Sequence, residues 1–490
     1  MAKLTTQAGG VSLGRGVATL AGLATAMILS RLLDEHEYGT YRQVWLVFFT
    51  LAPVLELGIP PSVSYFVPQL RRPDLKPYLV QHSTLLLISG AIMGLGCFGL
   101  GDAVGQLFGN PDLGRQLRLF ALFPALTLPF NMTENTLVAL GHGGKAGWVS
   151  GGSALLQMGV IVGALVYGGS MERVFLALSL WALVRWTAGA AALYTLARGL
   201  PFHWDRAALR TQLLFSLPMA AATMAGVLGR HLDKVVISSF FTPEQYAIYA
   251  NGSYDIPLIN ILTLSVTAVL VPSIVRARTD DDTAEVQRLW HGGARRLAWA
   301  FFPATVGLFL LAEPLMVLLF SEKYAASAAP FRVLVLILPA RIAMHSAFLR
   351  ALGSTKPILR ASLIALGSSL VLSLILVQIE WLGLLGPAIA SVTGAYLAIV
   401  YTIVVVNRIL GWHWRDYLPW QTLGGMVLVS LAAALPTLWA IQLMGGAAVW
   451  LRVLVPGGVY AGAYVAIGWL SGAAHPREWL QAISDLIRQR

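Results

Sequence analysis

Charged residues are scarce in this chain of 490 residues, and cysteine is nearly absent. Asp, Glu, Lys and Arg together make up 12% of the sequence, about half of their share in soluble domains. Apolar residues make up 57%, and the mean hydropathy is +0.70. The single Cys97 excludes an internal disulfide and argues against a thiolate metal site. This composition excludes an ordinary soluble protein and predicts a chain embedded in lipid.

Signatures of nucleotide, metal or covalent chemistry are also missing. The segment 141–146 looks like a phosphate-binding loop, but the first glycine of that motif would fall on Ala139 and its final hydroxyl on Ala146. No Cys or His set has metal-ligand spacing, and no convincing pair of nucleophile and base is visible. The sequence therefore predicts no cofactor, no metal and no enzyme activity. Uphill transport would have to use an H⁺ or Na⁺ gradient.

Long apolar runs occupy most of the chain. Fourteen runs remain when the sequence is broken at charges and at Pro and Gly clusters, and most can cross ~30 Å of hydrocarbon as helices. They cover roughly residues 11–33, 43–67, 79–101, 117–140, 146–168, 172–196, 211–241, 246–272, 296–320, 328–351, 358–379, 382–406, 419–444 and 449–471. The predicted fold class is an all-α polytopic membrane protein with 14 transmembrane helices.

The positive net charge of +11 is spread unevenly over the loops. If the N-terminus lies inside, most Lys and Arg residues fall in cytoplasmic loops, as the positive-inside rule requires. An even number of spans then places both termini in the cytoplasm. The charge is thus explained by membrane orientation, and no nucleic-acid partner is predicted.

A repeated stretch divides the chain into two halves. ILSRLLDEHEYGTY at 28–41 returns in degraded form as VISSFFTPEQYAIY at 236–249. Two later echoes, LFGN with LFSE and ALGHGGK with ALGSTK, keep nearly the same spacing. The echoes are displaced by six runs, which is an even number. The halves are therefore predicted to be two parallel six-helix lobes, related by an axis along the membrane normal.

The repeat defines the predicted domains. Helices 1 to 6 form an N-terminal lobe, helices 7 to 12 form a C-terminal lobe, and helices 13 and 14 are appended. A cytoplasmic interfacial linker joins the lobes, and an amphipathic cytoplasmic tail ends the chain. The boundaries are 1–200 for the N-terminal lobe, 201–215 for the linker, 216–410 for the C-terminal lobe, 411–473 for the appended helices and 474–490 for the tail.

Polar residues at membrane depth are costly, so they mark candidate sites. Arg15 lies on a stripe of small and polar residues of helix 1, and the equivalent stripe of helix 7 carries Arg230 and Lys234. Both stripes keep helical spacing and point to a shared central space. A competing interpretation is that the two cations of helix 7 snorkel at the outer interface.

Helices 4 and 10 are repeat mates and carry further polar residues. Arg341 and His345 are predicted to lie one turn apart on helix 10. On helix 4, Asn131 and Glu134 share one face. Arg341 lies deep in its span, and a deep arginine without a function is unexpected.

Three carboxylates at depth are candidates for ion coupling. They are Glu56, just before a break expected at Gly58, Glu134 on helix 4 and Asp255 on helix 8. Burial favours the protonated form of a carboxylate, and a nearby cation reverses this, so movement relative to an arginine could switch protonation. The competing interpretation is that these acids only neutralise Arg341 and Arg185 in buried pairs. We assign Arg185 a structural role.

The whole chain resembles the MOP (multidrug/oligosaccharidyl-lipid/polysaccharide) exporter superfamily, and within it the Wzx-type polysaccharide and lipid-linked oligosaccharide flippases. The resemblance rests on the fourteen spans, the parallel lobes, SRLLDEHEYGTY after helix 1, VPQL after helix 2 and ALGHGGK after helix 4. It implies a bacterial inner-membrane protein that moves an undecaprenyl-diphosphate-linked oligosaccharide by alternating access. O-antigen, capsule or exopolysaccharide biosynthesis would be the pathway, with membrane lipid and polysaccharide polymerases as partners.

The resemblance also implies a basic central cavity, which suits a diphosphate that must cross lipid. Two alternatives stay open: a cation-coupled multidrug antiporter of the same superfamily, and a membrane polysaccharide polymerase or glycosyltransferase. The cations and the last two helices count against the first, and the short outer loops count against the second. We assign substrate binding to Arg341, Arg230, Lys234, Arg15, His345 and Asn131.

Overall fold

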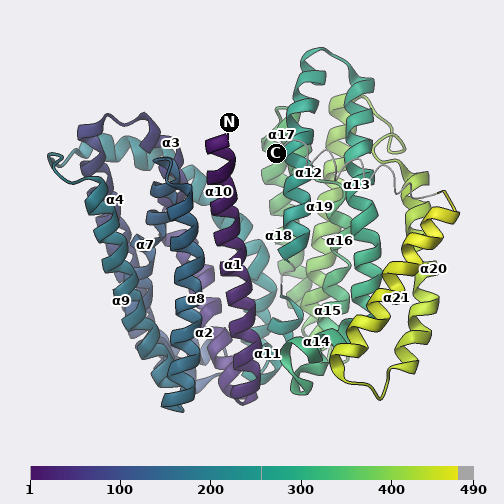
Figure 1. Ribbon diagram of the computed structural model, residues 1–490, viewed down its shortest axis with the longest axis horizontal. Coiled ribbons are helices and arrows are strands. Elements are labelled where there is room, and N and C mark those ends of the chain that lie inside the picture. The colour runs from purple at the N-terminus through teal and green to yellow at the C-terminus, as the bar shows by residue number, and fades with distance from the viewer. Residues whose placement is uncertain (1, 255–256, 473–490) are drawn as a thin grey trace. The chain divides into compact units, whose positions relative to one another are not determined.

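The computed structural model describes residues 2–254 and 257–472, and within these ranges the chain is helical and contains no strand. The chain divides into two compact units, residues 1–247 and 248–490. In Figure 1 the first unit runs from purple to teal, and the second from teal to yellow. The all-helical part of the predicted fold class is confirmed.

The first unit is built from long helices that lie side by side. α1 packs against α8, while α7 packs against both α4 and α9 (Figure 1). The helices are α1 (Ala2–Leu32), α2 (Glu35–Leu55), α3 (Ile59–Phe66), α4 (Leu75–Gly99), α5 (Gly101–Leu107), α6 (Pro111–Phe120), α7 (Leu122–Ala139), α8 (Gly143–Gly168), α9 (Met171–Leu196) and α10 (Arg206–Phe240), with 3₁₀ turns η1 (Val67–Gln69) and η2 (Arg72–Asp74). α11 (Pro243–Gly252) begins in this unit and ends in the second.

Glycines bring α1 and α8 into backbone contact. A Cβ added at Gly14 would collide with the carbonyl oxygen of Gly147, and one added at Gly147 would collide with that of Gly10. We call these three residues the glycine seam. Small residues allow helices in membranes to approach this closely. The seam sets how α1 crosses α8, and thereby the position of every side chain on α1.

The second predicted span is broken where α2 meets α3, at a bend of 40°. Leu57 and Gly58 both have positive φ, of 53° and 69°. A Cβ at Gly58 would also collide with the carbonyl oxygen of Ser216 on α10, so glycine serves both the turn and the close approach. The break expected at Gly58 is confirmed, and Glu56 lies immediately before it.

α10 is one continuous helix of 35 residues. Its start is capped by the side chain of Asp205, which accepts a hydrogen bond from the backbone N–H of Ala208 at 2.9 Å. Residues 206–215 of the predicted linker therefore form its first turns. Because α10 packs on α2 and α3, it belongs to the first compact unit, although the repeat assigns it to the second lobe. The lobe boundaries remain a prediction from the repeat.

The second unit contains the remaining helices. α18 packs on α19, and α20 packs on both α21 and α13. The elements are α12 (Pro257–Thr279), α13 (Thr283–Leu310), α14 (Ala312–Phe320), η3 (Glu322–Ser327), α15 (Ala328–Val335), α16 (Leu338–Arg341), α17 (His345–Ala351), α18 (Lys356–Leu376), α19 (Leu385–Leu410), α20 (Trp420–Leu443) and α21 (Val449–Leu470).

Aromatic side chains attach the last two helices to the rest of the second unit. Tyr460 of α21 donates a hydrogen bond to the carbonyl oxygen of Ser430 on α20, at 3.2 Å. Tyr464 donates to the carbonyl oxygen of Trp299 on α13, at 3.1 Å. In Figure 1, α20 and α21 lie together at one edge of their unit. Buried tyrosine hydroxyls thus find acceptors across all three helices.

The predicted helix 10 is not continuous. α15, α16 and α17 replace it, and Met344 between the last two has a positive φ of 34°. Arg341 is the last residue of α16, while His345 is the first of α17. The prediction that these two residues lie one helical turn apart is therefore wrong, because the backbone between them is not helical.

Within residues 2–254 and 257–472, ten helices are long and apolar enough to cross a membrane, or up to twelve if each of two strongly bent pairs is one span. Each of the fourteen predicted runs overlaps a helix or a broken helix, but the number fourteen and the parallel lobes stay predictions. The cytoplasmic orientation of both termini also stays a prediction. The predicted tail, 474–490, lies outside the described residues.

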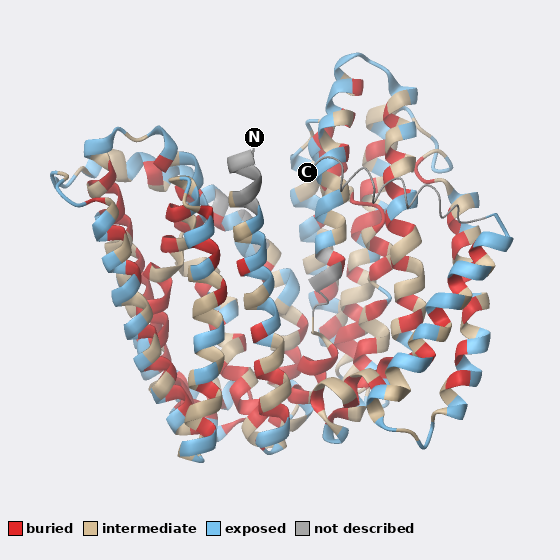
Figure 2. Cartoon of the chain, viewed as in Figure 1, coloured by how far each residue is buried: buried red, intermediate tan, exposed pale blue. Residues whose placement is uncertain are grey.

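Large apolar side chains are exposed on these helices. Leu95, Leu435 and Trp469 are examples, and Figure 2 shows exposed residues along the length of the outer helices. Such extended apolar surface is unsuited to water and suited to lipid. The chain is a multi-pass membrane protein.

Candidate functional site

Arg15 and Glu134 form an ion pair between α1 and α7. The Nε of Arg15 donates to Oε1 of Glu134 at 2.8 Å. The glycine seam holds α1 where this contact can form. The Arg15 side chain is 60% exposed and that of Glu134 is 21% exposed. Such a half-exposed pair contributes about 0–1 kcal/mol, so Arg15 can exchange this partner for another anion at little cost.

Asn131 lies on α7 one helical turn before Glu134, and there it meets Glu56. Asn131 donates from Nδ2 to Oε1 of Glu56 at 2.7 Å. Glu56 reaches α7 because α2 ends there, at the break before Gly58. Asn131 and Glu134 on α7 thus contact Glu56 at the end of α2 and Arg15 on α1, and we call these four residues the α7 polar cluster.

The α7 polar cluster corrects one of the sequence interpretations. Glu134 is paired with Arg15, and Glu56 is hydrogen-bonded to Asn131. In the part of the chain that the structure describes, Arg185 pairs with neither acid and with no other carboxylate. The idea that these acids neutralise Arg185 is therefore wrong. Hydropathy locates a charged residue at depth, but it does not tell which helix supplies the partner.

The α10 candidates lie on one helix, as their spacing predicts. Lys234 donates from Nζ to the carbonyl oxygen of Arg230 at 3.1 Å, and Nζ lies 3.8 Å from Oδ1 of Asp233. The Arg230 side chain is exposed and makes no ion pair with any described residue. Sequence reasoning missed Asp233, which is buried beside the lysine. The sequence signal that could have identified Asp233 was its position inside an apolar run.

The other candidates belong to the second unit or lie outside the described residues. Arg341 is partly buried at the end of α16. His345 opens α17, and its Nδ1 is buried without a hydrogen-bond partner in the described chain. Discontinuous helices of this kind often surround transporter binding sites. Asp255 lies outside the described residues.

Sequence reasoning also missed an ionic cluster at the repeated turns. His36, in the first turn of α2, lies with Nδ1 2.7 Å from Oε1 of Glu244 and Nε2 3.1 Å from Oδ2 of Asp112. His36 and Glu244 are 208 residues apart and occupy the same position in the two copies of the repeat. The constant spacing was the signal that could have paired them.

Two members of this cluster, His36 and Glu244, have shifted pKa values. Burial alone lowers the pKa of His36, but hydrogen bonds and charges from Glu244 and Asp112 outweigh burial and raise it. Burial raises the pKa of Glu244, but hydrogen bonds, including those from Thr242 and His36, outweigh burial and lower it. These turns lie between predicted spans, so the cluster can respond to the pH of the adjacent water.

The first prediction concerns the pH dependence of stability. The His36 contribution is complete below about pH 6.5 and is lost as pH rises through the raised pKa. The Glu244 contribution is present above about pH 4.5 and is lost as pH falls through the lowered pKa. His36→Gln should therefore destabilise the protein most between about pH 4.5 and 6.5, by no more than about 1 kcal/mol because the cluster is partly exposed.

Thermal unfolding of both proteins across this pH range measures the difference. His203→Gln is the matched control, because His203 is exposed in the described structure. If the gap between wild type and His36→Gln grew above pH 8, the assignment of the cluster would be wrong.

Two family models match the chain. The one described as "Polysaccharide biosynthesis protein" matches residues 6–278. The one described as "Lipid II flippase MurJ" matches residues 147–469. Each match covers more than half of the chain.

A curated relative and two solved structures are similar to the chain. The lipopolysaccharide biosynthesis protein WzxC of Escherichia coli (strain K12) is 25% identical over 325 residues, which span 62% of this chain and 60% of WzxC, less than two thirds of its length. Lipid II flippase MurJ in an inward closed conformation has a TM-score of 0.72 at 14% identity, covering 94% of this chain and 98% of its own. An inward-facing multidrug resistance MATE family transporter has a TM-score of 0.66 at 17% identity, covering 80% and 94%. At these identities the structures show the fold alone.

Proposed function

Because this chain belongs to the polysaccharide biosynthesis protein family of the MOP superfamily, with its Wzx-type flippases, we propose that it moves a lipid-linked polysaccharide precursor across a bacterial inner membrane. The cargo is an undecaprenyl-diphosphate-linked oligosaccharide. The movement is alternating access, in which the two lobes open to one side of the membrane at a time. The protein acts as a transporter, and no step of it makes or breaks a covalent bond.

The observation that carries this proposal is the set of available cations on membrane-spanning helices. Arg15 is 60% exposed in a weak pair, and the exposed Arg230 makes no ion pair in the described chain. Cations at such depth are costly unless they have a function. A diphosphate is the anion that most needs them, because it cannot enter hydrocarbon unpaired. Guanidinium groups hold phosphate oxygens in pairs of hydrogen bonds.

The α7 polar cluster suggests how substrate and ion movements are linked. Diphosphate oxygens compete with the Glu134 carboxylate for Arg15, since both are anions that accept from the same guanidinium. When Arg15 turns to the substrate, Glu134 loses its cation and takes up a proton or Na⁺ more readily. Release of the substrate restores the pair and expels the ion.

The second prediction tests this coupling. In proteoliposomes, transport of the lipid-linked oligosaccharide should respond to an imposed H⁺ or Na⁺ gradient. The triple variant Glu56→Gln, Glu134→Gln, Asp255→Asn should lose most of that response, because the three carboxylates assigned to ion coupling are gone. Full gradient-driven activity of the variant, or wild-type transport that ignores every gradient, would disprove the coupling.

The proposed function itself is tested by mass spectrometry of lipids that co-purify with the protein, followed by a transport assay with the lipid identified. A polyprenyl-diphosphate-linked glycan should be found and moved. The alternative is a cation-coupled multidrug antiporter, which the MATE-like fold and the acids of the α7 polar cluster favour. Transport of a cationic dye by purified protein, with no lipid-linked glycan bound, would select that alternative.

A further inference from the structure

A crevice of about 490 Å³ opens between α7, α8 and α9 in the first unit. It is separate from the α7 polar cluster, and none of the residues assigned to substrate binding lines it. Most of its walls are apolar. The residues that decide its chemistry are Phe130, Thr133, Trp148, Ser153, Trp181 and Arg185.

Arg185 is a cation in this crevice without a counter-anion. Its Nη1 donates to Oε1 of Gln157 at 2.8 Å, and its guanidinium lies 4.3 Å from the centre of the Phe130 ring. No Asp or Glu lies within ion-pair distance of it in the residues that the structure describes. A buried charge that no opposite charge balances is strongly unfavourable. The structural role first assigned to Arg185 does not account for this cost.

Two hydrogen-bond donors of the crevice have no acceptor. Nε of Arg185 and Nε1 of Trp181 are both buried, and neither has a partner in the described chain. They are one helical turn apart on α9 and belong to residues that line the same crevice, although the two donor atoms themselves lie beneath its surface. Buried donors are nearly always satisfied, so two adjacent exceptions beside an unbalanced cation need an explanation. Once the lining side chains move aside, an anion with several oxygens can accept from both donors and balance the charge of the guanidinium.

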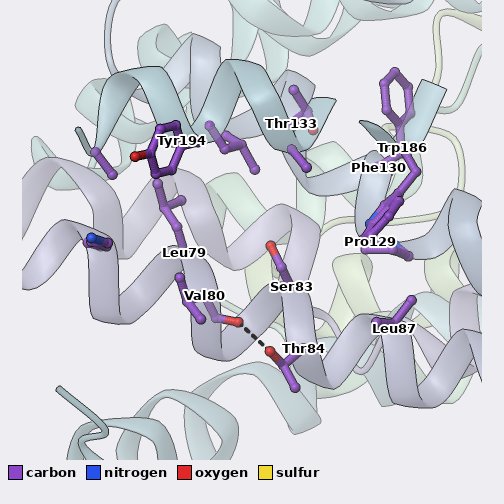
Figure 3. Close-up of a pocket in the computed structure, with 14 residues that line it drawn as sticks. Leu79, Val80, Ser83, Thr84, Leu87, Pro129, Phe130, Thr133, Trp186 and Tyr194 are labelled. Carbon is purple, nitrogen blue, oxygen red and sulfur yellow. Dashed lines mark hydrogen bonds between the residues drawn. The ribbon is translucent and has the colours of Figure 1, made fainter. Parts of the chain in front are cut away.

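A neighbouring crevice shows that the need for an anion is confined to the crevice beside Arg185. It has a volume of about 220 Å³, lies between α4, α7 and α9, and shares Phe130 and Thr133 as a wall (Figure 3). Its charged lining residue, Lys76, donates from Nζ to the carbonyl oxygen of Leu200 at 3.1 Å. The Thr84 hydroxyl donates to the carbonyl oxygen of Val80 at 2.8 Å, drawn as a dashed line in Figure 3. The Thr84 hydroxyl needs no further partner, and Lys76 lies in the first turn of α4, near the end of the span, where water can solvate its ammonium group.

The depth of Arg185 in the membrane indicates which anion it binds. α9 runs from Met171 to Leu196, so Arg185 lies about 21 Å from one end and about 16 Å from the other at ~1.5 Å per residue. With ~30 Å of hydrocarbon, this is close to the middle of the membrane. The phosphates of resident phospholipids stay at the two surfaces. A phosphate group that reaches Arg185 therefore belongs to a lipid that is crossing.

We propose that this crevice is a second station for the diphosphate of the translocated lipid, held by Arg185 and Trp181 while the prenyl chain lies along the apolar walls. The proposal rests on the proposed function and adds a site to it. Gln157 is a positioning residue, since its amide oxygen orients the guanidinium. Trp148, 81% exposed, lies at the crevice and offers an aromatic face to the sugar next to the diphosphate.

The experiment measures binding of undecaprenyl diphosphate, without sugar, to the purified full-length protein by native mass spectrometry. Arg185→Gln should weaken binding at least tenfold, and Arg185→Lys should weaken it less because it keeps the charge but not the fork of donors. Lys76→Gln is the matched control, because it removes one positive charge from the neighbouring crevice. It should bind like wild type.

A second variant and a second lipid keep the test decisive. Trp181→Phe keeps an aromatic ring but removes the Nε1 donor, so it should weaken binding several-fold even if Arg185→Gln fails to fold. Equal binding by wild type and folded Arg185 and Trp181 variants would overturn the proposal. Displacement of undecaprenyl diphosphate from Arg185 by equimolar phosphatidylglycerol would also overturn it, since the crevice would then be a phospholipid site.

The two proposals fail in different ways. A wild-type protein that moves lipid-linked oligosaccharide, but whose Arg185→Gln variant binds and moves it equally well, would refute only the second station. A wild-type protein that moves no lipid-linked oligosaccharide would refute the proposed function, whatever Arg185 binds.

Discussion

An alanine in place of Gly147 should destabilise the protein by about 3 kcal/mol, at the upper end of the cost of overpacking. Its Cβ would collide with the carbonyl oxygen of Gly10, which is backbone and cannot rotate away. α1 would have to move off α8, and the ion pair of Arg15 with Glu134 would be lost with it. The change adds only one methyl group, so its effect depends entirely on the glycine seam.

Gly159 provides a control on the same helix. It is exposed within α8, and a Cβ added there would meet nothing within 4 Å. Gly159→Ala should therefore leave stability unchanged or raise it by up to about 1 kcal/mol, because alanine is the better helix former. Thermal unfolding of the purified proteins compares the two. Equal melting temperatures for both variants would show that α1 and α8 are not held together by this seam.

Replacing Arg341 with alanine should weaken binding of undecaprenyl diphosphate about 10- to 100-fold. This corresponds to the ~1.5–3 kcal/mol of hydrogen bonds to a charged group. Arg341→Lys should recover only part of the loss, because an ammonium group cannot hold two phosphate oxygens in a fixed fork. Binding is measured on protein shown to be folded and inserted. Arg341→Lys binding as tightly as wild type would contradict the role of a bidentate anchor.

A competing role for Arg341 is a gate that closes onto Glu134. The Glu134 carboxylate already accepts from Arg15 through Oε1, so Arg341 would have to share this carboxylate with Arg15 or displace it. The two roles separate in Arg341→Ala. If this variant binds the lipid with unchanged affinity but cannot close, as distance measurements between labelled lobes would report, the gate is correct and the anchor is refuted.

The sequence by itself determined that the chain is helical, crosses the membrane many times and belongs to the flippase superfamily. These conclusions depend on hydropathy and span length, which are local properties, and on short motifs that keep their order. The break at Gly58 was also visible, since a glycine two residues before a pair of prolines is a local signal. The positions of Arg15, Glu56 and Glu134 on membrane-spanning helices followed from the same local reasoning.

Only the tertiary structure decided which residues meet. Glu134 pairs with Arg15, whereas Arg185 faces a crevice without an acid, because helix crossings set by contacts such as the glycine seam choose the partners. Met344 in a left-handed conformation separated Arg341 from His345, although neither its type nor its hydropathy predicts a break. Hydropathy reports how deep a residue lies, and only the packing of distant segments determines what lies beside it.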